Sequence, residues 1–131
     1  MSVKELRVVQ WNCQGLYPKL TRFKHFLYDN KPHIACLSET GLKPNREPKF
    51  VGYTSYFEHR LHTTGGGLLI LVKNELSSYK KRLDPFRSGQ LEVQSVVVLS
   101  NKGELQILNS YNPCKNISQH DFEQMVSKKM Q

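Results

Sequence analysis

The chain has 131 residues, which is room for one domain with a substantial core and not for two. Its 19 Lys and Arg residues against 11 Asp and Glu leave a formal charge of +8. This excess favours a polyanionic partner such as DNA, RNA or an acidic membrane surface, although basic residues also serve solubility alone. No run is long enough to span a membrane, and the first residues lack a signal-peptide pattern. We therefore expect an intracellular protein, nuclear or cytoplasmic, that is not secreted.

The cysteines and two histidines argue against a zinc site. Cys13, Cys36 and Cys114 are odd in number and far apart, with neither paired zinc spacing nor a disulfide framework. We predict that they are reduced thiols. His59 and His62 are spaced to share a metal, but no third ligand accompanies them, so we predict no zinc there.

Residues 6–15 predict a strand that ends in a polar tip. Val8 and Val9 favour an extended, half-buried backbone, whereas Asn12 and Gly15 favour a turn. Asn12 should therefore lie where the strand leaves the core. A short polar side chain held by a rigid strand end suits a functional site.

A helix and a second strand follow. Residues 18–30 have Leu20 and Phe23 at helical spacing and predict a helix. Residues 33–39 predict a strand that ends on the carboxylate of Glu39. Strand, helix and strand form a βαβ unit, which predicts an α/β fold.

The ends of these two strands form the first candidate site. In open α/β sheets, ligands collect at the carboxyl ends of parallel strands, so Asn12 and Glu39 are expected to converge there. Oxygen ligands of this kind suit a hard ion such as Mg²⁺. The alternative is that Asn12 only shapes a turn and Glu39 is a solvated strand-end acid.

The middle of the chain predicts a basic loop and two further strands. Residues 40–52 are rich in Pro, Gly and Lys and predict the loop, and residues 53–57 predict a strand. Residues 68–72 are apolar at every position, which indicates a strand covered on both faces. The glycines at 65–67 allow close approach to a ligand or a neighbouring strand, or form a hairpin with a bulge. They do not match a Walker-type phosphate loop.

The last third predicts a hairpin and a helix. Residues 73–90 are polar, and we assign no strand to them. Residues 91–99 and 104–110 flank a turn signal and predict paired strands. The second strand ends at Tyr111, a candidate contact to phosphate or metal-bound water, or else a packed rim aromatic. Residues 118–131 predict the start of a helix.

Four short segments stand in a specific order: Trp-Asn-Cys-Gln-Gly at 11–15, Leu-Ser-Glu-Thr at 37–40, Arg60 ahead of the glycines at 65–67, and Tyr-Asn-Pro at 111–113. Together they resemble the endonuclease/exonuclease/phosphatase superfamily. The nearest likeness is to the apurinic-type endonuclease domain of non-LTR retrotransposons, such as LINE-type and jockey-like elements. The likeness runs over residues 6–126 and corresponds to the first half of that domain.

The resemblance implies one domain over residues 1–131, with its core motifs in 6–114 and the helix at 118–131. It implies an α/β fold, the N-terminal half of a two-layer β-sandwich flanked by helices, of the DNase I-like type. Each half of that sandwich would contribute one sheet, so residues 68–72 and 96–99 would be under-buried. An uncovered sheet face would also allow self-association.

The resemblance also implies roles for site residues. Asn12 matches the family asparagine that orients phosphate or metal-bound water, and Glu39 matches a magnesium ligand. Tyr111 matches the family tyrosine near the scissile phosphate and, with Asn12, is expected to act in catalysis. Arg60 and Asn112 are expected to bind the substrate.

The chain departs from the family pattern at several positions. Cys114 stands where an asparagine is frequent, Ser38 replaces a frequent glutamine, and Gly41 replaces a common tryptophan. The family's later aspartate, its further acidic ligand and its catalytic histidine have no counterpart, since Asp121 and His120 sit at a helix start. We therefore expect weak or absent Mg²⁺ binding and little or no activity for these residues alone.

The function implied is that of a fragment of a Mg²⁺-dependent endonuclease that nicks target DNA for retrotransposition. Its partners would be DNA and, in a full-length element, a downstream reverse transcriptase domain. Two alternatives to the endonuclease stay open. In the first, the chain is a non-catalytic, basic nucleic-acid binder. In the second, it belongs to a superfamily phosphatase that acts on another phosphoester.

Overall fold

The computed structural model describes residues 5–60, 65–82 and 92–112. The strands form two sheets, a four-stranded sheet in the order β1-β2-β4-β3 and a three-stranded sheet in the order β5-β6-β7. The first contains β1 (Val8–Asn12), β2 (Ile34–Ser38), β3 (Tyr53–Glu58) and β4 (Leu68–Lys73), and the second β5 (Ser77–Lys80), β6 (Glu92–Ser100) and β7 (Gly103–Tyr111).

The predicted βαβ unit is present. β1 and β2 are parallel, in a register that pairs Asn12 with Ser38. Between them, a 3-10 turn η1 (Tyr17–Lys19) leads into helix α1 (Leu20–Asn30). The helix ends at Lys31, which has a left-handed φ of 48° and donates its main-chain N–H to the oxygen of Leu27.

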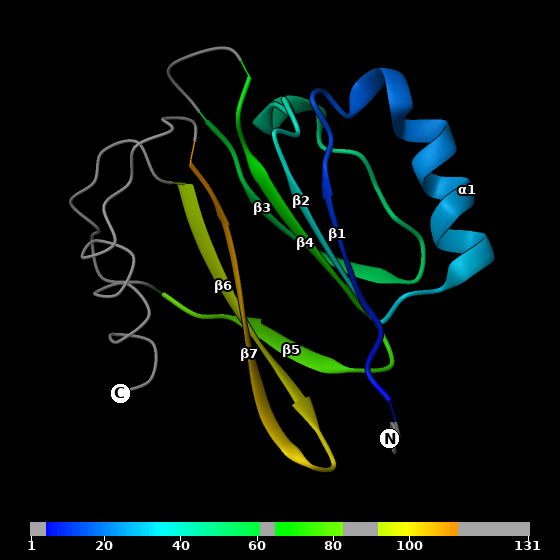
Figure 1. The fold of residues 1–131 in the computed structure, drawn as a ribbon, viewed down its shortest axis with the longest axis vertical. Helices are drawn as coiled ribbons and strands as arrows, with labels where there is room; N and C mark the ends of the chain where they lie inside the picture. Colours follow the sequence, from blue (N-terminus) through cyan, green and yellow to red (C-terminus); the bar gives the residue numbers. More distant parts are fainter. Residues whose placement is uncertain (1–4, 61–64, 83–91, 113–131) are drawn as a thin grey trace.

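Three layers result, with α1 on one side of the first sheet and β5–β7 on the other (Figure 1). Alternate residues of β2 and β4 face opposite layers, as expected for strands. The helix-facing cluster includes Phe23, Leu27, Ala35, Leu37, Leu69 and Leu71. The cluster between the sheets includes Ile34, Cys36, Ile70, Val72, Val96 and Val98. β4 therefore has helix and loop residues on one face and the second sheet on the other.

The predicted under-burial is wrong for residues 68–72 and for Val96–Val98. All five residues of 68–72 are fully buried, and Val96, Val97 and Val98 are at most 2% exposed. It holds for Leu99, at the end of the second run, which is 37% exposed. The cause of the burial is that the described chain contributes strands to both sheets instead of to one. The ground for expecting self-association through an uncovered inner face is thereby removed for these strands.

The structure confirms the predicted hairpin and adds one strand that was not predicted. The hairpin of β6 and β7 is antiparallel, as predicted, and pairs Glu92 with Tyr111. The strand β5 was not predicted, because its Ser-Ser-Tyr-Lys sequence is mostly exposed and shows no apolar pattern. The predicted helix at 118–131 and Cys114 lie outside the described residues. No helix in the described ranges has the length and apolar character needed to cross a bilayer.

Candidate active site

The carboxyl ends of β1 and β2 lie side by side, and the loops that follow remain paired. Main-chain N–H groups of Cys13 and Gly15 donate to the oxygens of Ser38 and Glu39, both at 2.9 Å. Asn12 is exposed and faces Ser38 across the register. The structure thus places the two predicted site residues, Asn12 and Glu39, at neighbouring strand ends.

Glu39 has an unusual backbone. Its φ of 52° lies in the left-handed region, where a residue with a Cβ loses about 1 kcal/mol or more. The following residues hold it there, because Thr40 and Gly41 donate main-chain N–H groups to Gly67 at 3.2 Å and Gly66 at 2.7 Å. The turn after β2 is therefore fixed by the glycine segment in front of β4.

The glycines at 65–67 serve close backbone approach. Gly67 has a φ of 96°, and a Cβ placed on it would lie 2.7 Å from Thr40 Oγ1. On Gly66, a Cβ would collide with the side chain of Arg60, which packs directly against it. Of the alternatives that the sequence left open, close approach to a neighbouring segment accounts for these two positions.

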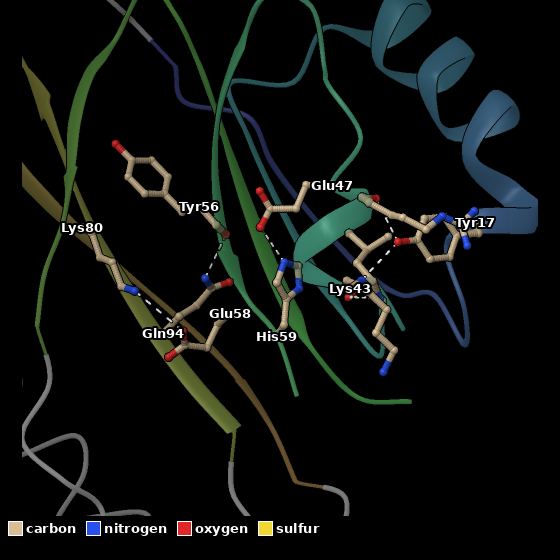
Figure 2. A network of polar contacts seen from close by, with 11 residues as sticks. Tyr17, Lys43, Glu47, Tyr56, Glu58, His59, Lys80 and Gln94 are labelled. Carbon is tan, nitrogen blue, oxygen red and sulfur yellow. Dashed lines mark hydrogen bonds and ion pairs between the residues drawn. The ribbon is translucent and has the colours of Figure 1, made fainter. Parts of the chain in front are cut away.

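A buried amide pair joins the two sheets just below the rim, which is formed by the carboxyl ends of β1, β2 and β7 and by the start of β6. Asn109, only 2% exposed, donates from Nδ2 to the oxygen of Leu37 at 3.0 Å, with the Leu69 oxygen at 3.4 Å. Its register partner Gln94 accepts from the same nitrogen at 2.9 Å, and donates to the Tyr56 oxygen at 3.0 Å (Figure 2). Buried amides with these partners fix the separation and register of the two sheets.

Two residues beyond this pair, β7 delivers Tyr111 to Glu39. The hydrogen bond between the Tyr111 hydroxyl and the Glu39 side chain is the main cause that raises the pKa of this phenol. Partial burial and the negative charges of Glu39 and Glu92 act in the same direction, whereas Arg60 opposes them. The hydroxyl therefore stays protonated near neutral pH and can donate to an anionic oxygen.

Arg60 and Glu92 complete the rim on the side of the second sheet. Arg60 Nε donates to Glu92 Oε2 at 2.8 Å, and the main-chain N–H of Gly67 donates to Glu92 Oε1 at 3.1 Å. Glu92 is also the register partner of Tyr111. The rim thus contains two carboxylates, of which Glu92 is engaged by a guanidinium and a backbone amide.

Sequence reasoning named some of these residues and missed others. Asn12, Glu39, Arg60 and Tyr111 were named, as was Asn112, which directly follows Tyr111 and is half-buried. Three residues were missed: Glu92, Gln94 and Asn109. A signal for the first two existed, since they alternate in phase with the inward residues Val96 and Val98 and so place polar groups on the inner face.

His59 is hydrogen-bonded to the side chain of Glu47. Its Nε2 lies 2.7 Å from Glu47 Oε2 (Figure 2). Its side chain is 6% exposed, and its ring packs on Phe57. His62 lies outside the described residues. Among the residues that the structure describes, no group of three or more His, Cys, Asp or Glu could hold a metal ion.

The oxygen ligands at the rim are of the kind that binds a hard ion such as Mg²⁺, but there are few of them. Glu39 supplies one carboxylate, and Asn12 at the neighbouring strand end supplies an amide oxygen. Mg²⁺ is commonly held by one or two carboxylates together with water and substrate oxygens. These residues therefore fit a partial magnesium site that a phosphate and further ligands would complete.

Comparison with known proteins shows the family. The sequence profile of the Endonuclease/Exonuclease/phosphatase family matches residues 9–108, and the chain belongs to this family. A "Probable RNA-directed DNA polymerase from transposon BS" of Drosophila melanogaster is 26% identical over 125 residues, which are 92% of this chain and 14% of that protein. The predicted superfamily is thereby confirmed, and the similarity to a transposon protein agrees with the predicted retrotransposon branch.

Solved structures show the same fold. The endonuclease domain of TRAS1, a telomere-specific non-LTR retrotransposon, aligns with a TM-score of 0.69 at 18% identity, over 96% of this chain and 55% of that one. The AP endonuclease LMAP from Leishmania major gives 0.66 at 18% identity, over 92% and 44%. The DNase I-like α/β fold is confirmed, and the chain spans about half the length of these neighbours.

Proposed function

We propose that this chain forms part of the catalytic domain of a Mg²⁺-dependent DNA endonuclease of the retrotransposon type. The observation that carries the proposal is that Tyr111 and Glu39 lie two residues beyond the hydrogen bond from Asn109 to Leu37 that joins β7 to β2, with Asn12 on the adjacent strand end. β7 and β2 belong to two different sheets, so this arrangement assembles a polar rim from distant parts of the sequence. An intracellular site of action, nuclear or cytoplasmic, is part of the same proposal.

Each rim residue has a role that its chemistry allows. Glu39 would hold the magnesium ion, which, when bound, offsets negative charge on the phosphodiester. Asn12 would orient a phosphate oxygen or a water, and Tyr111, as a protonated phenol, would donate to a phosphate oxygen. Arg60 and Asn112 would bind the substrate backbone, because a guanidinium suits phosphate recognition.

Activity is proposed for a longer polypeptide that contains these residues. The chain covers 14% of the transposon BS protein and 55% of the TRAS1 endonuclease domain. One carboxylate binds magnesium weakly, and hydrolysis also requires a base and donors for the leaving oxygen. We expect the 131 residues alone to nick DNA slowly or not at all, and a reverse transcriptase domain to act with the complete enzyme.

A nicking assay on supercoiled DNA tests the proposal. It compares this chain, a polypeptide extended to the full family domain, and the extended form with Glu39→Ala, each with Mg²⁺ and with EDTA. We expect Mg²⁺-dependent nicking by the extended form and its loss, by a hundredfold or more, on Glu39→Ala. The matched control is Glu104→Ala, which removes an exposed carboxylate from the far end of the β6–β7 hairpin.

The outcome separates the endonuclease from its alternatives. An extended form that nicks equally well with and without Glu39 would contradict the proposal. Binding of DNA without any nicking would instead support the nucleic-acid-binding alternative. Hydrolysis of small phosphomonoesters in place of DNA would support the phosphatase alternative.

A further inference from the structure

Glu92 links three segments that are far apart in the sequence. It begins β6, and its two carboxylate oxygens accept from Arg60, which follows β3, and from the main chain of Gly67, which precedes β4. One carboxylate of the second sheet therefore holds both sides of the connection between β3 and β4 in the first sheet. The side chains of Arg60 and Glu92 are 27% and 18% exposed, so the ion pair is shielded from much of the solvent.

Arg60 is confined from two directions. Its guanidinium is held by Glu92 at 2.8 Å on one side, and its side chain packs on the Cα of Gly66 on the other. An arginine side chain has many rotamers, and holding it in one conformation before a ligand arrives reduces the entropy lost on binding. Arg60 also contributes to the electrostatics of Tyr111, so it is held close to the proposed site.

Glu92 itself is poorly placed to be a magnesium ligand. Both of its oxygens already accept charge-assisted or backbone hydrogen bonds, and its charge is offset by the guanidinium. Glu39, in contrast, contacts the neutral hydroxyl of Tyr111. The two carboxylates of the rim therefore have different environments and different roles.

We infer that Glu92 is a positioning residue: it holds the guanidinium of Arg60 and the backbone of Gly67 at the rim, in the arrangement that receives a phosphate of the DNA. The second half of this inference rests on the proposed function. A simple electrostatic view predicts the opposite effect of removing Glu92, since losing a negative charge near the site should tighten binding to a polyanion. The two views are thus separated by the sign of the effect.

The first measurement requires no DNA. In ¹⁵N-labelled chain, the Nε–H signal of Arg60, assigned by its loss in Arg60→Lys, is expected to exchange slowly with water and to lie apart from solvated arginines. Glu92→Ala should move it to the position of a solvated arginine and shift the Gly67 amide signal as well. Glu92→Gln, which retains an acceptor but no charge, should give an intermediate shift. The exposed control Glu104→Gln should change neither signal.

The second measurement is binding of a fluorescein-labelled DNA duplex at low salt, followed by anisotropy. We expect Glu92→Gln, Glu92→Ala and Arg60→Ala each to weaken binding by roughly fivefold to twentyfold, since one charge-assisted phosphate contact is lost. The double variant Glu92→Ala/Arg60→Ala should bind no more weakly than Arg60→Ala alone. Glu104→Gln should leave the affinity unchanged or slightly tighter.

The two measurements distinguish failure of the inference about Glu92 from failure of DNA binding. An Arg60 signal that is unchanged in Glu92→Ala would overturn the inference, as would tighter DNA binding by Glu92→Gln or losses that multiply in the double variant. If the wild-type chain binds no duplex, these 131 residues do not bind DNA by themselves, and nicking by the extended form still tests the proposed function. The Arg60 signal alone then decides whether Glu92 positions the arginine. Dispersed amide signals of Val96–Val98 in each variant check that the sheet is intact. Should Glu92→Ala lose this dispersion, Glu92→Gln decides.

Discussion

The side-chain nitrogen of Asn109 on β7 lies 3.0 Å from the main-chain oxygen of Leu37 on β2, in the opposite sheet. Two residues further along each strand, Tyr111 contacts Glu39. Asn109 and Tyr111 are two residues apart, and so are Leu37 and Glu39. The buried Asn109 amide therefore sets the register in which the Tyr111 phenol meets the Glu39 carboxylate. The proposed site therefore depends on Asn109, a buried residue that joins the two sheets.

Replacement of Asn109 by Ala should destabilise the fold. The change removes the donor to the Leu37 oxygen and to the side-chain oxygen of Gln94, and each unsatisfied buried polar group costs about 1–3 kcal/mol. We expect the free energy of unfolding to fall by about 2–4 kcal/mol, measured by urea denaturation. The control Asn101→Ala, in the exposed hairpin turn, should change it by less than about 0.5 kcal/mol. Equal effects of both variants would contradict the proposed role of Asn109.

Local sequence patterns were sufficient for much of the first sheet and the hairpin. Periodicity predicted α1, a continuous apolar run predicted β4, and a turn signal predicted the pairing of β6 with β7. Strand ends with polar side chains predicted Asn12, Glu39 and Tyr111 as candidates. These features depend on neighbours in sequence, which is why they could be found without coordinates.

Pairings between the sheets could not be predicted in this way. Asn109 and Leu37 are 72 residues apart, and Arg60 and Glu92 are 32 apart. Nothing in the local pattern of a strand says which distant oxygen an amide will meet. The expectation of one sheet per half failed for the same reason, since it assigned whole strands to a layer without knowing how β5 and β6 fold back onto β4.

Replacement of Gly67 by Ala should be more damaging than the same change at Gly65. Both glycines have a positive φ, of 96° and 77°, but only a Cβ on Gly67 would meet Thr40 Oγ1, at 2.7 Å. Gly65→Ala should therefore cost about 1 kcal/mol of backbone strain, and Gly67→Ala an additional 1–3 kcal/mol from overpacking. Urea denaturation of the two variants measures the difference. Equal losses would show that the glycine segment can move away from the turn after β2.

The thiols of Cys13 and Cys36 should be unreactive in the folded chain. Burial raises the pKa of Cys13 from 9.0 to about 12, with Lys19 opposing this shift and Glu39 adding to it, and burial raises that of Cys36 to about 11. In a Cys114→Ser background at pH 8, both should react with a thiol reagent only as fast as the chain unfolds. Rapid labelling without denaturant, at a rate insensitive to urea, would contradict this prediction.

The same thiols make stability depend on pH in a known direction. Because both pKa values are raised in the folded chain, the unfolded chain loses these protons first as the pH rises above 9.0. Their contribution is complete below that pH and is lost as the pH rises through about 11 and 12. Cys13→Ser and Cys36→Ser should each flatten the decline in the urea midpoint over this range.

Replacement of Glu39 by Gln should lower the pKa of Tyr111 toward the ordinary value of 10.0. The hydrogen bond to the Glu39 carboxylate is the largest cause of the raised pKa, and its negative charge adds to it. The measurement is the tyrosinate absorbance during an alkaline titration with EDTA present. The chain has six tyrosines, so the signal of Tyr111 is obtained by subtracting the titration of the matching Tyr111→Phe variant.

The control for this titration is Glu47→Gln, which removes an exposed carboxylate that pairs with His59 instead of Tyr111. It should leave the Tyr111 titration unchanged, whereas Arg60→Gln should raise the pKa further, because Arg60 lowers it. The sign of the Arg60 effect is informative, since it requires the guanidinium to be held near the phenol. A Tyr111 pKa that is the same with Glu39 and with Gln at position 39 would mean that the two side chains do not meet, and the candidate site would lose its central contact.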